Sequence, residues 1–133
     1  MGAWGTGLFE DDTSLDLVSD VLDTDAKSFV KNSSAYAGAD YLEYDQCQEI
    51  IISGVILDSI LNDSQYEVPD ETFYEWISTQ DSEGLDVLKG DIISGLKLVI
   101  SEKSELNELW QENEEDYPAW KKNIENLIAN LSG

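Results

Sequence analysis

The sequence lacks histidine and arginine entirely, and its seven basic residues are all lysine. Histidine is the commonest general base near neutral pH, and arginine is the usual clamp for a phosphate or carboxylate group. A chain without either is poorly equipped for hydrolysis or group transfer. We therefore expect a protein that is not an enzyme and that needs no cofactor.

Cysteine is scarce as well, since Cys47 is the only one. A lone cysteine excludes a disulfide framework and argues against a cysteine-based zinc site. It fits a reducing compartment, so we expect a cytoplasmic protein. Because it lacks a histidine partner and lies in a predicted helix, Cys47 is interpreted as a structural thiol rather than a nucleophile.

Long hydrophobic runs are also missing. The longest apolar cluster, residues 50–61, is short and is interrupted by Ser53, Gly54, Asp58 and Ser59, so it does not suit a helix that spans a bilayer. No positively charged stretch precedes an apolar one, and a signal peptide is therefore not expected.

Negative charge is what the chain has in abundance. Its 29 aspartates and glutamates against seven lysines give a net charge of −22 at pH 7. Residues 1–66 hold 13 acidic residues and two lysines, and residues 67–133 hold 16 and five, so the charge is spread along the fold. Such a surface repels nucleic-acid phosphates and anionic membranes. A basic protein is the partner that the charge favours.

Apolar residues recur at helical spacing along most of the chain, which at 133 residues is predicted to be one domain, residues 1–133. The expected fold is all-α, a single compact bundle of about five to six helices. The predicted helices cover residues near 12–23, 42–61, 85–100, 104–111 and 118–131, while 26–31 fits a short helix or an extended piece and 32–39 a loop. A further helix around Phe73, Trp76 and Ile77 starts either at Pro69 or after Thr72 and ends before the break at residues 82–84.

Several local signals refine this prediction. Ile50, Ile51 and Ile52 also suit a strand, but they lie in a long segment that is apolar on nearly every face, as in a helix buried among others. Gly54 within that helix indicates a close helix crossing. Ser104 is predicted to cap the helix that follows it. Thr72 and Glu75 match a capping box, and Pro69 suits a first helical position.

Two tryptophans lie near the C-terminus. Trp110 and Trp120 sit on the apolar faces of their predicted helices, with an acidic segment between them. We expect them to belong to the core. The alternative is that they mark a binding edge, because aromatic residues are enriched in binding hot spots.

The first twelve residues combine three glycines, two large aromatic residues and three consecutive carboxylates. We interpret residues 1–11 as a docked N-terminal clamp, in which Trp4 and Phe9 fill a groove between helices and Asp11 or Asp12 caps the first helix. The same residues could present a partner surface. A phosphate-binding loop is not favoured, because Glu10, Asp11 and Asp12 lie where the phosphate would be. The first six residues also match a myristoylation pattern. This modification is not favoured, because the pattern is short and no basic patch would assist membrane binding.

The opening Gly2-Ala3-Trp4-Gly5-Thr6-Gly7-Leu8-Phe9-Glu10-Asp11-Asp12 resembles that of a family of small, mostly bacterial proteins of unknown function. These proteins open with a Gly-Ala-Trp-Gly-x-Gly-x-Phe-x-x-Asp signature. A weaker similarity covers residues 104–110 and Trp120. The resemblance implies one helical domain and no particular activity.

Together these features predict a non-enzymatic acidic domain that binds a basic protein, as an immunity (antidote) protein or an inhibitor does. Trp4, Phe9, Glu10, Asp11 and Asp12 are its candidate partner-binding or clamp residues. One alternative is a metal-dependent hydrolase that uses carboxylates, but no set of acidic residues has the spacing of a known metal loop and no metal site is expected. Another is a structural domain whose charge only provides solubility or salt adaptation.

Overall fold

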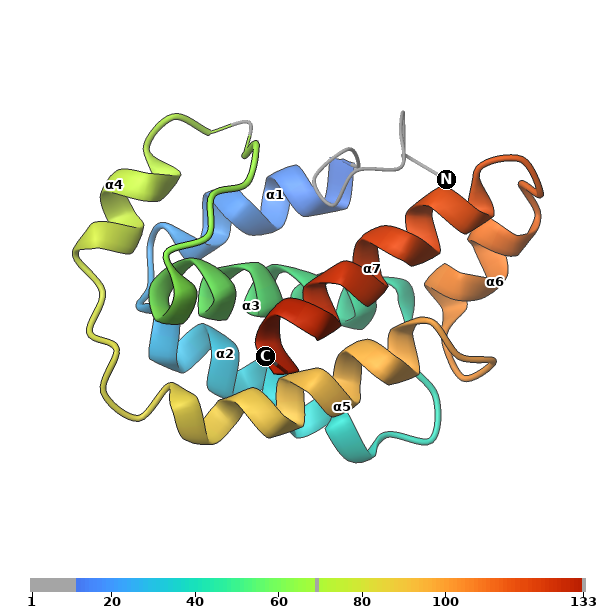
Figure 1. Cartoon of the computed structure of the whole chain (residues 1–133), viewed down its shortest axis with the longest axis horizontal. Coiled ribbons are helices and arrows are strands. Elements are labelled where there is room, and N and C mark those ends of the chain that lie inside the picture. The colour runs from blue at the N-terminus through green and yellow to red at the C-terminus, as the bar shows by residue number, and fades with distance from the viewer. Residues whose placement is uncertain (1–11, 69, 133) are drawn as a thin grey trace.

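The computed structural model describes residues 12–68 and 70–132, apart from the side chain of Asp12. The described residues form helices and no strand, which confirms the all-α prediction (Figure 1). These residues contain seven α-helices, where five to six were expected in the chain. They are α1 (Asp12–Val21), α2 (Ala26–Ser34), α3 (Tyr44–Asn62), α4 (Phe73–Ser78), α5 (Lys89–Val99), α6 (Glu105–Gln111) and α7 (Tyr117–Ser132), with 3₁₀ helices η1 (Ala35–Gly38) and η2 (Asp86–Leu88).

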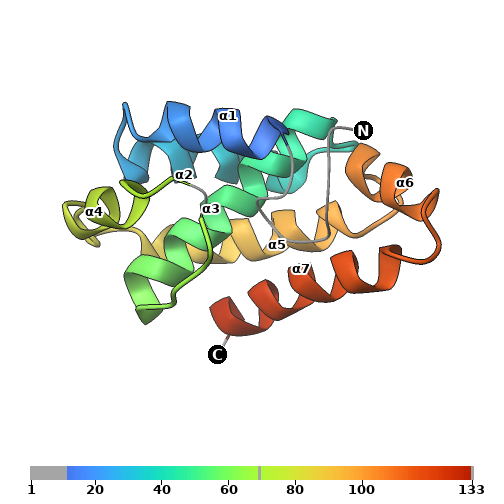
Figure 2. The same ribbon diagram turned by 90° about the horizontal axis from the view of Figure 1, so that it is seen from above.

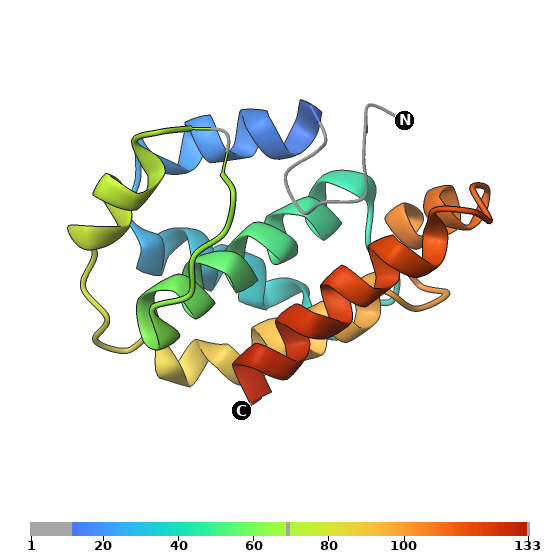
Figure 3. The ribbon, with the colours of Figure 1, turned by 45° about the horizontal axis from the view of Figure 1, so that its top comes forward.

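Helix α3 lies at the centre of the bundle. It contacts each of the other six α-helices, and Figures 2 and 3 show α1 and α7 on opposite sides of it. Every residue from Ile50 to Ser59 is buried. This explains why the segment has no polar face, and it confirms that the three consecutive isoleucines belong to a helix rather than to a strand.

Two glycines allow the neighbours of α3 to approach closely. A Cβ atom placed on Gly54 would lie 2.9 Å from Leu127 Cδ2 of α7 and 3.2 Å from Leu96 Cδ1 of α5. On α5, a Cβ atom on Gly95 would lie 3.2 Å from Ile50 Cγ2. The close crossing predicted at Gly54 is therefore confirmed, and it involves two helices at once.

The start of α3 is joined to the start of α6. The backbone N–H of Leu42 donates to the carbonyl of Lys103, and the N–H of Glu105 donates to the carbonyl of Leu42, at 2.8 and 2.9 Å. Ser104 caps α6 as predicted, because its hydroxyl accepts a hydrogen bond from the N–H of Asn107. The junction is completed by Cys47, whose Sγ lies 3.2 Å from the Ser104 hydroxyl.

Three predictions of local structure are wrong. The loop expected at residues 32–39 is the end of α2 followed by η1, because the Ser33 hydroxyl donates to the carbonyls of Phe29 and Glu49 and holds the chain against α3. The single helix expected at residues 85–100 is divided into η2 and α5. The predicted capping box of α4 is absent, since the Thr72 hydroxyl donates to Asp70 instead. Pro69 lies outside the described residues.

The C-terminal tryptophans belong to the core, as expected. Trp110 and Trp120 are 5% and 3% exposed, and their rings stack with centroids 5.8 Å apart. Their stacking joins α6 to α7, and this burial removes them as candidates for a binding edge. In the part of the chain that the structure describes, no helix has the length and apolar character needed to cross a membrane.

Candidate functional site

The proposed N-terminal clamp lies outside the described part of the chain. Trp4, Phe9, Glu10 and Asp11 are not described, and Asp12 is described only as the first residue of α1. The clamp therefore stays a prediction. The described residues offer two other features that could carry a function: a surface groove between α1 and α4, and a buried cluster around Asp58.

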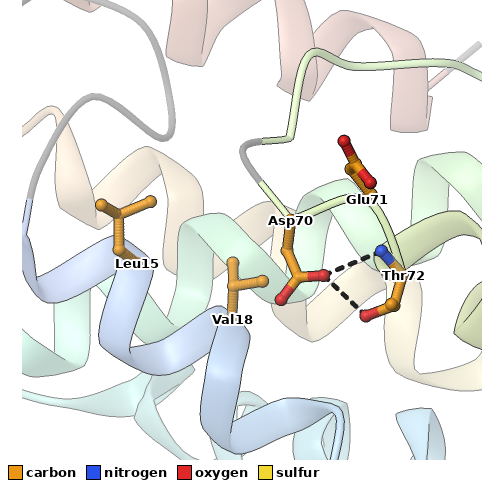
Figure 4. Close-up of a pocket in the computed structure, with 5 residues that line it drawn as sticks. All are labelled: Leu15, Val18, Asp70, Glu71 and Thr72. Carbon is orange, nitrogen blue, oxygen red and sulfur yellow. Dashed lines mark hydrogen bonds between the residues drawn. The ribbon is translucent and has the colours of Figure 1, made fainter.

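The groove has two adjoining parts, which share Thr72. One part, of about 480 Å³, is lined by Leu15 and Val18 of α1 and by the turn at residues 70–72 (Figure 4). The other, of about 330 Å³, is lined by Leu22 of α1 and by residues of α4 and its ends. We call the two parts together the α1–α4 groove. The lining residues are Leu15, Val18, Leu22, Asp70, Glu71, Thr72, Glu75, Trp76 and Thr79.

One face of α1 supplies the apolar side of this groove. Leu15, Val18 and Leu22 are spaced by three and four residues, so they lie along one stripe of the helix. Val18 is buried, whereas Leu15 and Leu22 are half-buried. Figure 4 shows Leu15 and Val18 projecting from α1 toward the turn that carries Asp70. An apolar side chain of a ligand could cover this stripe and remove it from water.

The opposite side of the groove is acidic. The Asp70 carboxylate accepts hydrogen bonds from the N–H and the hydroxyl of Thr72, at 2.8 and 2.6 Å, and these bonds lower the pKa of Asp70. Glu71 and Glu75 are exposed beside it. Among the described residues that line the groove, three are acidic and none is basic. The groove therefore favours a cationic ligand.

Hydrogen bonds hold α4 in place beside α1. The indole N–H of Trp76 donates to the carbonyl of Thr24, just beyond α1, at 3.0 Å. The side chain of Gln80 accepts from the backbone N–H of Ala26 at 2.9 Å and donates to the carbonyl of Trp76 at 3.1 Å. The Trp76–Thr24 and Gln80–Ala26 hydrogen bonds join residues that are 52 and 54 positions apart in the sequence. Figures 1 and 2 show α4 beside the C-terminal end of α1, where these hydrogen bonds hold it.

The second feature is Asp58, a carboxylate with no exposed surface in the C-terminal part of α3. It accepts hydrogen bonds from the hydroxyl of Tyr66, from Asn62 Nδ2 at 2.8 Å and from Asn130 Nδ2 of α7 at 3.2 Å. Asn62 Nδ2 also lies 3.3 Å from the carbonyl of Asn130. We call Asp58, Asn62, Tyr66 and Asn130 the Asp58 cluster. Three donors around one buried carboxylate satisfy much of its hydrogen-bonding capacity.

The Asp58 cluster also fixes the segment that leads to the groove. Asp63 ends α3 in the left-handed conformation, with φ of 58°, and the N–H of Ser64 returns to the Asp58 carbonyl at 3.3 Å. The N–H of Tyr66 then donates to the hydroxyl of Tyr74 on α4 at 2.7 Å. The first residues of the connection between α3 and α4, 64–66, are thereby held to both helices, and Asp70 follows four residues after Tyr66.

Burial decides what the Asp58 cluster can do chemically. Burial and the hydrogen bond to Asp58 raise the pKa of the Tyr66 hydroxyl, so Tyr66 stays protonated and keeps donating. Because Asp58 has no exposed surface, a substrate cannot reach its carboxylate without local unfolding. Its role is to position α7 and the segment between α3 and α4. Within residues 12–68 and 70–132, no group of three or more acidic or cysteine side chains could hold a metal ion.

Cys47 agrees with its interpretation as a structural thiol. It is buried on α3, and burial raises the pKa of its thiol. A thiol that stays protonated is a poor nucleophile.

Sequence reasoning identified neither the groove nor the cluster. The position of Asp58 in the middle of an apolar helix indicates that its carboxylate needs buried hydrogen-bond donors. No sequence spacing identifies Tyr66 or Asn130 as those donors. Likewise, nothing in the sequence pairs Leu22 with Trp76, which lies 54 residues away.

A family model described as a domain of unknown function (DUF4259) matches residues 2–123 of the chain. No curated protein matches the chain, and no solved structure matches it. The residues, rather than a characterised relative, must therefore supply the functional argument.

Proposed function

Since the chain belongs to the DUF4259 family, whose function is unknown, we propose its function from its own surface. It is a non-enzymatic acidic domain that binds a basic protein partner and covers it, in the manner of an immunity (antidote) protein or an inhibitor. The observation that carries this proposal is the net charge of −22, distributed over both halves of the chain.

Many of the carboxylates that carry this charge are exposed on the surface of the protein. Asp16 and Asp20 lie four residues apart on the exposed face of α1, and Glu71 and Glu75 are exposed across the groove. Carboxylates that are brought close without cations repel one another, and a basic partner would relieve that repulsion on binding. The same charges would steer a basic protein toward the complex and raise its association rate by 10- to 1000-fold at low salt.

The class of partner follows from the sign of the charge. A nucleic acid or an anionic membrane would bring more negative charge to a surface that already carries an excess. A protein rich in lysine and arginine is complementary to it. The presence of a single cysteine, with no second one in the sequence to pair with, supports the cytoplasm as the place of the encounter. The predicted N-terminal clamp of residues 1–11 is proposed as a second contact for such a partner.

The test is capture followed by kinetics. The purified full chain is immobilised, exposed to lysate of the cells that make it, and the bound proteins are identified and purified. We expect a partner with a strongly basic isoelectric point, whose association rate constant falls at least about tenfold between about 20 and 300 mM salt. Captured partners that are neutral or acidic, or association that ignores salt, would overturn the proposal and leave the charge as a solubility device.

A further inference from the structure

We propose that the α1–α4 groove is the docking surface for the basic partner, and that it receives a short segment in which lysine or arginine side chains flank apolar ones. This inference rests on the proposed function, because it names the place and the chemistry of the same encounter. The groove offers the segment an apolar stripe along α1 and, on the opposite side, the carboxylates of Asp70, Glu71 and Glu75.

The apolar stripe is the first requirement for such a segment. Leu15 and Leu22 are half-buried, and they continue the buried Val18 toward the surface. Across the groove, the half-buried Trp76 adds an aromatic surface. When a ligand covers apolar groups that line a surface depression, their removal from water stabilises the complex. A ligand made only of charged side chains would leave this area uncovered.

The second requirement is charge, which the turn before α4 and α4 itself supply. The exposed Asp16 and Asp20 of α1 lie on the face of that helix turned away from its apolar stripe, and they add only to the wider negative field. The turn before α4 supplies Asp70 and Glu71, and α4 itself supplies Glu75. The lowered pKa of Asp70 keeps its carboxylate ionised. Cationic side chains on the edge of a bound segment that faces α4 would therefore meet carboxylates, whereas an acidic or phosphorylated segment would be repelled.

The groove needs little rearrangement to receive a ligand. Asp70 is held by Thr72, and α4 is held to the end of α1 by the Trp76–Thr24 hydrogen bond. Four residues before Asp70, Tyr66 is held by its contacts with both Asp58 and Tyr74. A site whose walls are already fixed loses less conformational entropy on binding.

The length of the groove sets the length of the segment. Helix α1 has ten residues, and a helix of that size is about 15 Å long. A helical segment of about ten residues would match it, with its apolar residues spaced by three and four so that they lie along one stripe.

A designed peptide tests the location directly. The probe is a blocked 14-residue peptide of leucine and lysine, with leucines at i, i+3, i+4 and i+7 spacing and lysines elsewhere. It is titrated into the isotope-labelled full chain, and amide chemical shifts are followed. We expect the largest shifts within residues 15–22 and 70–79. The same peptide with glutamate in place of lysine should produce none. Shifts centred elsewhere, or none up to about 1 mM of the lysine peptide, overturn the groove assignment.

Matched variants separate the groove from general charge attraction. The E71K/E75K double variant reverses two charges at the groove, and E112K/E114K reverses two exposed charges in the segment between α6 and α7. Each moves the net charge from −22 to −18, because each glutamate-to-lysine change adds two. We expect the first to raise the dissociation constant of the lysine peptide at least tenfold and the second less than threefold.

Apolar variants complete the test. Leu22→Ser should weaken binding of the lysine peptide at least threefold, and Val87→Ser, at a residue that is 76% exposed, should leave it unchanged. Circular dichroism confirms that each variant is folded. Equal losses in both charge variants, with binding that still falls with salt, overturn the groove and keep the proposed function. If salt weakens neither the binding of the lysine peptide nor that of the captured partner, the proposed function itself is overturned.

Discussion

The hydroxyl of Tyr66 donates a hydrogen bond to the buried carboxylate of Asp58, eight residues earlier in the chain. This bond closes the connection that leaves α3 at Asp63 and returns toward α4. The same carboxylate binds Asn130 of α7, which is 72 residues away. One acidic side chain thus fixes three parts of the fold, and one of these parts carries the acidic wall of the groove.

Removing that carboxylate should be costly. Asp58→Ala leaves the donors of Tyr66, Asn62 and Asn130 without their acceptor in a buried site, and we expect the free energy of unfolding to fall by about 3 kcal/mol or more. Asp40→Ala removes the same charge from an exposed position and should change it by less than about 0.5 kcal/mol. Urea unfolding of both variants measures the difference. Equal values would show that the Asp58 cluster does not hold the fold together.

Alkaline pH should destabilise the protein in part through Tyr36. A hydrogen bond to Glu49, followed by burial, raises the pKa of Tyr36 to about 12 in the folded state, whereas an unfolded tyrosine titrates near about 10. The folded state therefore holds this proton more tightly. The resulting stabilisation is complete below about pH 10 and is lost as the pH rises toward about 12.

The variant Tyr36→Phe isolates this contribution. Unfolding free energies of the wild type and of Tyr36→Phe are measured from pH 8.5 to 11.5, and the wild type should lose stability more steeply above pH 10. Lysine deprotonation acts on both proteins and cancels in the comparison. Parallel curves would contradict the assignment of the raised pKa to Tyr36.

Moderate salt should stabilise the protein. With a net charge of −22, compaction brings carboxylates closer than they are in the unfolded chain. Raising the salt from about 10 to about 150 mM shortens the screening length from about 30 to about 8 Å, so the midpoint of thermal unfolding should rise. Mild acid near pH 5 should be tolerated, because partial protonation also relieves repulsion. A midpoint that falls on adding salt would mean that favourable ion pairs dominate.

The clamp prediction is tested at Trp4. If this side chain fills a groove between helices, Trp4→Ala should lower the free energy of unfolding by about 3–5 kcal/mol, and deletion of residues 1–9 should lower it at least as much. Val87→Ala, at a position 76% exposed, provides the control. A loss below about 0.5 kcal/mol for Trp4→Ala would place the tryptophan at the surface and favour a role in contacting a partner.

Divalent metal ions should act only through ionic strength. We expect 1 mM Mg²⁺, Mn²⁺, Ca²⁺ or Zn²⁺ to change the thermal unfolding midpoint no more than KCl of matched ionic strength does. Exposed carboxylates attract such ions diffusely rather than in a defined shell. A saturable shift with one metal, absent with the others, would revive the alternative of a metal-dependent hydrolase.

The sequence was a good guide wherever a signal was local and repeated. The apolar residues around Ile51, the stacked Trp110 and Trp120 and the Ser104 cap each occupy the place that helical spacing predicts. Burial of an apolar face is enough to fix such elements. The fold class and the core of the bundle could therefore be predicted.

The wrong predictions of local structure concern polar side chains that have more than one possible hydrogen-bond partner. Ser33 reads as a loop residue, but its hydroxyl binds the carbonyl of Glu49 on the central helix. Thr72 reads as a helix cap, but the nearby Asp70 competes for its hydroxyl. The α1–α4 groove was missed for a related reason, since its two sides come from segments that only tertiary packing brings together. These hydrogen bonds and helix pairings depend on distances in the folded protein, which the spacing of residues along the sequence does not give.

The central position of α3 determines how the protein loses its structure. Each of the other α-helices covers part of a helix that has no polar face, so the departure of any one of them exposes isoleucine, valine or leucine to water. Unfolding should therefore be all-or-none, and the backbone amides of α3 should exchange with solvent hydrogen only when the whole domain opens.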